Sequence, residues 1–158
     1  MIRVTKPESK AEWAAVIAVA LFGTMAAIQI GIACGLLPSD IVWGGANDSL
    51  SLQASMASLA ACVILCGMAY IIHRRTQPMP SKFNRGASWF IAFYMGLNTL
   101  GNLLGKTWVE QYVFGSMTLA LCICSCVVAT SQPLGLDVSR EEEGGVATAS
   151  TPLSGPLV

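Results

Sequence analysis

The sequence predicts an all-α membrane protein, a bundle of four transmembrane helices with the N- and C-termini in the cytoplasm. Hydrophobic residues make up 54% of the chain and charged residues 11%, whereas about a quarter of an average soluble domain is charged. The charges also gather in short clusters, which leave four long uncharged runs between them. A soluble domain of 158 residues needs polar side chains over its whole surface and cannot hide four such runs.

The first two runs lie in the N-terminal half of the chain. The first lies between Glu12 and Asp40 and predicts a helix near residues 13–37. The second covers residues 49–73, is ended by two arginines, and predicts a helix near residues 51–73. A helix needs about 20 apolar residues to cross a hydrocarbon core of roughly 30 Å. Because hydrocarbon offers the backbone no hydrogen-bond partners, each crossing run must be helical.

The last two runs are joined by a short charged turn. The third lies between Arg85 and Lys106 and predicts a helix near residues 86–105. The fourth predicts a helix near residues 110–131, which ends before Pro133 because proline cannot continue a helix. The third and fourth helices therefore form a hairpin with a tight turn.

Two tails flank the predicted membrane domain, which covers residues 12–132. Residues 1–11 form a short cytoplasmic N-terminal tail. Residues 133–158 are rich in Gly, Ser, Thr and Pro and have too little apolar surface to pack, so we expect a disordered cytoplasmic tail.

The basic residues predict the orientation of the bundle. Of the nine Lys and Arg residues, only Lys106 lies in the two loops that face the side opposite the tails. Because cytoplasmic loops are enriched in Lys and Arg, the tails and the second loop are expected to be cytoplasmic. That loop, which we call the basic loop, contains Arg74, Arg75, Lys82 and Arg85. Such a cluster attracts anionic lipid headgroups, and its role as a topology signal explains it equally well.

Several function classes are disfavoured by composition. Zero net charge and the lack of a basic tract with interleaved aromatics argue against nucleic acid as a partner. The six cysteines form no C-x-x-C pair and His73 is the only histidine, so we expect no metal site and no cofactor. We assign no catalytic residue, because a Ser/His or His-rich constellation is missing.

Polar residues follow one face of the third predicted helix. Asn98, Asn102 and Lys106 are four residues apart and therefore climb the same face toward the outer surface. Lys106 can reach outward and pair with Glu110, which suits the N-terminus of the fourth helix. Two interpretations stay open for the amides: a hydrogen-bonded contact between helices, or a functional pocket.

The first outer loop adds Asp40 and Trp43. This loop either folds back over the mouth of the bundle or is a turn with an interfacial tryptophan anchor. In the first case all these residues form one outer polar cluster, which consists of Asp40, Trp43, Asn98, Asn102, Lys106 and Glu110.

Small residues recur at four-residue spacing on two of the predicted helices. Gly31 and Gly35 share a face of the first helix, and Gly101 and Gly105 share a face of the third. Glycine allows close helix approach where lipid supplies no hydrophobic driving force. These glycines are candidate helix-packing residues, whose partner is either another helix of this chain or a second copy.

Two segments resemble a known group of proteins. LLPSDIVWGG at 36–45 and NTLGNLLGKTWVE at 98–110 are similar to short four-span integral membrane proteins of bacteria and fungi that have no assigned activity. The resemblance implies the same four-span layout and favours the outer polar cluster as a site. Many members carry a glutamate early in the second span, where this chain reads LQAS at 52–55, so no role passes to that position.

Three functions are compatible with these patterns. The first is a small structural or accessory bundle in the lipid bilayer that packs against itself as a homodimer or against a larger membrane protein. The alternative is a homo-oligomeric transporter of small solutes or ions, although the spans lack a mid-membrane carboxylate for proton coupling. The second alternative is a membrane-embedded enzyme, for which Asp40, Lys106 and Glu110 are the only acid–base candidates.

Overall fold

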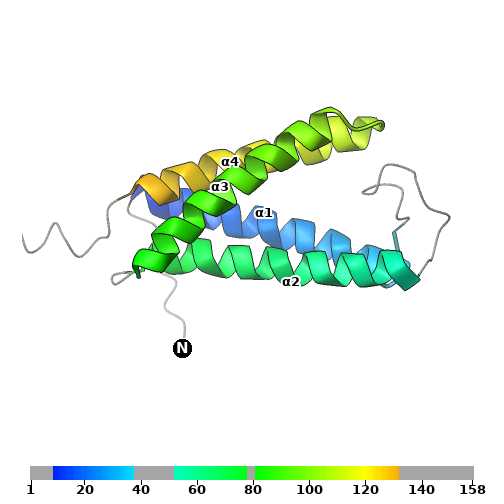
Figure 1. Cartoon of the computed structure of the whole chain (residues 1–158), viewed down its shortest axis with the longest axis horizontal. Helices are drawn as coiled ribbons and strands as arrows, with labels where there is room; N and C mark the ends of the chain where they lie inside the picture. The colour runs from blue at the N-terminus through cyan, green and yellow to red at the C-terminus, as the bar shows by residue number, and fades with distance from the viewer. Residues whose placement is uncertain (1–8, 38–51, 78–80, 132–158) are drawn as a thin grey trace, which may run out of the picture.

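The computed structural model describes residues 9–37, 52–77 and 81–131 and is all-α over these ranges (Figure 1). The elements are α1 (Lys10–Ala33), α2 (Leu52–Arg75), α3 (Lys82–Leu103), the π-helical segment η2 (Val109–Phe114) and α4 (Gly115–Thr130), which continues η2 directly. The predicted all-α class is confirmed for the described residues. Asp40, Trp43 and the predicted C-terminal tail lie outside the described residues.

The helices form two antiparallel hairpins, α1 with α2 and α3 with α4. The helices of each hairpin pack along each other, α1 also packs against α4, and α2 meets α3 and α4 much less. Figure 1 shows the hairpins together where α2 passes to α3 and apart near the turn between α3 and η2. We call these the basic end and the turn end of the bundle. Helix α1 begins and α4 ends at the basic end.

Helix α1 begins earlier than the uncharged run predicts because its first turn is capped. The backbone N–H of Glu12 donates to the Ser9 Oγ (3.2 Å), and the Ser9 N–H donates to the Glu12 Oε2 (3.0 Å). This reciprocal pair is a capping box, which satisfies two N–H groups that a helix start leaves without partners. Glu12 therefore lies inside α1, which starts at Lys10 instead of residue 13.

The other end of α1 is set by Gly35, at a positive φ of 71°. The Leu36 N–H donates to the Gly31 carbonyl (2.8 Å), and the Gly35 N–H donates to the Ile32 carbonyl (3.0 Å). These two bonds define a Schellman motif, for which glycine is the preferred left-handed residue. Helix α1 consequently ends at Ala33, before residue 37, and Gly35 terminates the helix instead of packing against another one.

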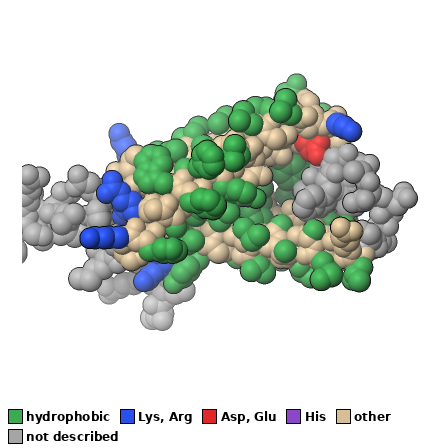
Figure 2. Space-filling view, viewed as in Figure 1, with side chains coloured by type: hydrophobic (Ala, Val, Ile, Leu, Met, Phe, Trp, Pro, Cys, Tyr) green, Lys and Arg blue, Asp and Glu red, His purple; other side chains and the backbone are tan. Residues whose placement is uncertain are grey.

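The core of the bundle combines small polar side chains with apolar ones such as Phe22, Met95 and Leu121. Many other large apolar side chains are exposed, as expected where lipid surrounds the helices. The hydroxyl residues Ser58, Ser88, Thr99, Thr118 and Ser125 are buried. Apolar side chains cover the surface between the two ends, and basic ones gather at the basic end (Figure 2). Three helical stretches are long and apolar enough to cross a membrane: Lys10–Ala33, Leu52–Arg75 and Val109–Thr130.

Candidate functional site

A cavity of about 480 Å³ lies between the two hairpins, where they diverge toward the turn end. We call it the inter-hairpin cavity. Its volume falls in the range of roughly 300–1,000 Å³ that is usual for small-molecule sites. Its polar lining consists of Gln29, Tyr94, Asn98, Asn102 and Thr118, and the other lining residues are alanine, methionine, leucine, isoleucine and phenylalanine. No charged side chain is among the lining residues that belong to the described ranges 9–37, 52–77 and 81–131.

The polarity of the lining changes along the bundle. At about 1.5 Å per helical residue, Asn98 lies about 6 Å deeper along α3 than Asn102, and Met95 lies about 10 Å deeper. The deeper part of the cavity is lined by Met25 of α1 and Leu65 of α2. The cavity is therefore polar near the turn end and mainly apolar toward the middle of the bundle, where the Tyr94 hydroxyl is the polar group beside Met25.

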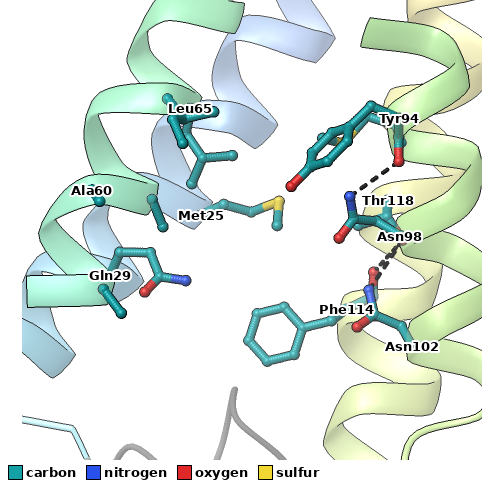
Figure 3. A pocket seen from close by; sticks show the side chains of 13 residues that line it. Met25, Gln29, Ala60, Leu65, Tyr94, Asn98, Asn102, Phe114 and Thr118 are labelled. Carbon is teal, nitrogen blue, oxygen red and sulfur yellow. Dashed lines mark hydrogen bonds between the residues drawn. The ribbon is translucent and has the colours of Figure 1, made fainter. Parts of the chain in front are cut away.

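Gln29 is the least satisfied polar residue of the cavity. Its side chain is only 7% exposed, and its amide nitrogen points from α1 into the cavity (Figure 3). The Gln29 Oε1 is buried and has no hydrogen-bond partner in the described part of the chain. Leaving a buried polar atom unpaired costs about 1–3 kcal/mol. The Ser58 Oγ, the Ser125 Oγ and the Arg75 Nε are also buried without a partner among the described residues, and Gln29 differs from these three in that it lines the cavity.

Asn98 presents a hydrogen-bond acceptor from the opposite wall. Its Nδ2 donates to the Tyr94 carbonyl of its own helix (3.0 Å). Its Oδ1 makes no hydrogen bond to the described residues and lies on the cavity side of α3 (Figure 3). The Tyr94 hydroxyl extends across the cavity toward Met25. Asn98 and Gln29 thus offer an acceptor and a donor to the same space.

Asn102 instead joins α3 to α4. Its Nδ2 donates to the Thr118 Oγ1 (3.3 Å), and the Thr99 hydroxyl lies 3.1 Å from the same oxygen. The Thr118 hydroxyl in turn donates to the Phe114 carbonyl (2.9 Å). Both asparagines line the cavity, but only Asn102 also makes the contact between helices.

Replacing Thr118 with valine is expected to lower the free energy of unfolding by about 1 kcal/mol. Valine keeps the shape of threonine and removes the acceptor of Asn102, and hydrogen bonds between membrane helices are worth about this much. The measurement is the thermal unfolding midpoint in detergent. Thr130→Val is the matched control, because Thr130 is exposed and donates only to carbonyls of its own helix. Equal midpoints for the two variants would contradict a stabilising role for the α3–α4 bond.

Glu110 closes the turn between α3 and η2 and is only 7% exposed. Its Oε2 accepts from the backbone N–H groups of Lys106 (3.1 Å) and Thr107 (3.2 Å), and from the Thr107 hydroxyl (3.1 Å). The Glu110 N–H donates back to the Thr107 Oγ1 (3.2 Å), which completes a capping box at the start of the helix. The Glu110 carboxylate therefore stabilises the turn and is not among the described lining residues of the cavity.

The expected ion pair between Lys106 and Glu110 is wrong. The carboxylate of Glu110 bonds the backbone of Lys106, and the Lys106 ammonium is exposed and makes no ion pair with the residues that the structure describes. The three bonds that converge on the Glu110 Oε2 hold it toward the turn, away from the lysine head.

The four packing glycines have different surroundings. A Cβ on Gly101 would meet no atom within 4 Å, and a Cβ on Gly31 would meet the Leu37 side chain at 2.9 Å. Gly105 is enclosed by the turn, where a Cβ would lie 2.8 Å from both the Cβ and the Oε2 of Glu110. Gly105 therefore allows the close approach of Glu110 in the turn, and Gly101 lies on an exposed face of α3.

One residue of the basic loop has a structural role. Arg75 is only 3% exposed, and its Nη2 donates to the Ser131 carbonyl (2.6 Å) just beyond the C-terminus of α4. Cations near a helix C-terminus satisfy free carbonyls and favour the helix dipole. Arg74, Lys82 and Arg85 are exposed. The predicted loop is shorter than expected, because Arg74 and Arg75 belong to the last turn of α2 and Lys82 and Arg85 to the start of α3.

Gln29, Tyr94, Phe114 and Thr118 were not among the predicted site residues. A glutamine inside a long uncharged run is itself a signal, because polar residues at membrane depth usually face the interior. Tyr94, Phe114 and Thr118 carry no comparable signal, since their contribution depends on how the hairpins pack. The pattern T-W-V-E at 107–110 matches a capping box and identifies the structural role of Glu110.

No group of three or more His, Cys, Asp or Glu side chains that could hold a metal ion occurs among residues 9–37, 52–77 and 81–131. Comparisons with known protein families, with curated proteins and with solved structures found no match for this chain.

Proposed function

We propose that this chain is a multi-pass integral membrane protein with four spans and cytoplasmic ends, which binds a small uncharged ligand in the inter-hairpin cavity as an accessory protein. The observation that carries the proposal is the buried amide of Gln29, whose Oε1 has no partner among the described residues and whose nitrogen points into a cavity with no charged side chain among its described lining residues. The resemblance to short four-span membrane proteins agrees with this layout.

The position of α3 supports a fourth span. Helix α2 ends at the basic end and η2 begins at the turn end, so α3 connects the two ends of the bundle. If α1, α2 and α4 span a membrane, α3 spans it as well. Its 22 residues extend about 33 Å, which exceeds the hydrocarbon core of roughly 30 Å. Helix α3 is less apolar than the three stretches Lys10–Ala33, Leu52–Arg75 and Val109–Thr130 because it carries charged residues and amides. Lys82 and Arg85 lie at its start, and Asn98 and Asn102 line the cavity.

The basic end supports cytoplasmic chain ends. The described basic residues at this end are Lys10, Arg74, Arg75, Lys82 and Arg85, whereas the turn end has Lys106. The positive-inside rule then assigns the basic end to the cytoplasm and the cavity to the outer half of the bundle.

The chemistry of the lining favours binding over catalysis or ion transport. The described part of the lining contains no carboxylate and no imidazole, the groups that general acid–base chemistry and proton coupling use. An ion would also lose its hydration without meeting an opposite charge. A neutral molecule with hydrogen-bonding groups meets neither obstacle. The exposed face of α3 around Gly101 remains available for a second copy or a larger membrane partner.

Filling the cavity tests the proposal. We expect the wild-type protein, released from membranes in mild detergent, to retain a bound small molecule in native mass spectrometry, and Ala61→Phe to lose it. Ala61 lines the cavity, whereas Ala27 is exposed elsewhere on α1, so Ala27→Phe is the matched control and should keep the adduct. Equal occupancy in all three proteins, or no adduct in the wild type, would contradict a binding role.

A further inference from the structure

The inter-hairpin cavity is open sideways between α2 and α3. These helices contact each other much less than the helices within each hairpin do, and Figure 2 shows the surface hollowed between them. Ile64 of α2 and Tyr94 of α3 line the cavity, yet they are 53% and 40% exposed. In a bilayer this opening faces acyl chains, so a molecule that enters through it comes from the membrane.

The polar groups of the cavity suit a head that has hydroxyl or ester groups and no charge. The Gln29 Nε2 can donate to an ester carbonyl or a hydroxyl oxygen, and the Asn98 Oδ1 can accept from a hydroxyl. A phosphate head would be buried without a counter-charge, because no Lys or Arg is among the lining residues that the structure describes. The amides of Gln29 and Asn98 therefore favour a lipid with an uncharged head over one with an ionic head.

The deeper part of the cavity suits the first carbons of an acyl chain. Met25, Leu65 and Met95 line it, and methionine side chains adapt to chains of variable shape. A volume of about 480 Å³ lies within the range of roughly 300–1,000 Å³ that is usual for small-molecule sites. This space accommodates a small head and the beginning of a chain, and the remainder of the chain extends through the side opening into the bilayer.

We infer that the inter-hairpin cavity binds an uncharged lipid of the diacylglycerol type, which enters between α2 and α3 and places its hydroxyl and ester groups at Gln29 and Asn98. This inference rests on the proposed function, because it names the ligand class of the same cavity. Under the proposed orientation the lipid belongs to the outer leaflet.

The probe that tests the inference is a diacylglycerol with a photoreactive acyl chain, in phosphatidylcholine nanodiscs that contain the full chain. We expect crosslinks to map to the cavity-facing parts of α2 and α3. Gln29→Leu should reduce the labelling about fivefold, the factor that corresponds to one lost hydrogen bond of about 1 kcal/mol. Gln53→Leu is the matched control, because Gln53 is exposed in the first turn of α2 and should leave the labelling unchanged.

Stability separates a binding role of Gln29 from a structural one. Because Gln29→Leu removes an unpaired buried amide, the lipid-free variant should melt at the wild-type temperature or above it. A lower melting temperature would make the amide a structural residue and overturn the inference, as would unchanged labelling in Gln29→Leu.

Competition distinguishes the inference from the proposed function. Unlabelled diacylglycerol should displace the probe, and phosphatidic acid with the same acyl chains should not. Equal displacement by phosphatidic acid would overturn the uncharged-head inference and leave the cavity a binding site. If Ala61→Phe is labelled as strongly as the wild type, the probe reacts only with the lipid-facing surface. That result would overturn both the proposed binding function and the diacylglycerol inference.

Discussion

Replacing Gly105 with alanine will lower the free energy of unfolding by about 3 kcal/mol. The new Cβ would lie 2.8 Å from the Cβ and the Oε2 of Glu110 and 2.9 Å from the Asn102 carbonyl oxygen. The carbonyl belongs to the last turn of α3 and cannot move without shifting the helix end. Overpacking of this kind costs about 1–3 kcal/mol, and displacing the Glu110 carboxylate weakens the cap by about 0.5–2 kcal/mol.

Gly101→Ala on the same helix is the control for this prediction. An added Cβ meets no atom within 4 Å there, and alanine favours a helix over glycine by roughly 0.5–1 kcal/mol. The two substitutions should therefore have opposite signs, as measured by thermal unfolding in detergent. Similar losses for both would mean that α3 packs against a partner at Gly101, and would contradict the assignment of Gly105 to the turn alone.

Arg75→Ala is expected to lower the free energy of unfolding by about 2 kcal/mol. The substitution removes the bond from the Arg75 Nη2 to the Ser131 carbonyl, and hydrogen bonds to charged groups contribute about 1.5–3 kcal/mol. Because this bond joins the end of α2 to the end of α4, amide hydrogen exchange should also accelerate in the last turn of α4. Arg75→Lys should recover only part of the loss, since an ammonium does not have the planar geometry of the guanidinium.

The neighbouring Arg74 provides the control for charge. Arg74 is exposed and belongs to the same basic loop, so Arg74→Ala removes one positive charge without removing the bond to Ser131. We expect Arg74→Ala to stay within about 0.5 kcal/mol of the wild type. If the two alanine variants lose equal stability, the effect of Arg75 is one of net charge at the basic end.

The ends of α1 show which helix boundaries can be predicted from short sequence patterns. Uncharged runs predict four helices, but α1 starts and ends before its run does, because Ser9 caps one end and Gly35 terminates the other. Both devices are visible in the sequence, as S-K-A-E at 9–12 and as a glycine after the last turn. These boundaries were therefore predictable from capping patterns, which hydropathy alone does not detect.

The candidate site was predictable only in part. The spacing of Asn98 and Asn102 correctly predicts that they share a face of α3, and both line the inter-hairpin cavity. Lys106 and Glu110 share the spacing but belong to the turn, because the chain reverses immediately after α3. Gln29 comes from a helix that is distant in sequence, and the divergence of the hairpins brings it opposite Asn98 (Figure 3).

The sequence by itself determined the helical class, the number of helices and the clustering of charge, because hydropathy, capping and backbone hydrogen bonding act between residues close along the chain. Only the tertiary structure decided which polar groups are satisfied. Asn102 meets Thr118 and Asn98 does not, and Arg75 meets Ser131 while Arg74 is exposed. Neighbours of the same type differ in this way because their partners lie on other helices, and the packing within and between the hairpins sets which of them come within hydrogen-bond distance.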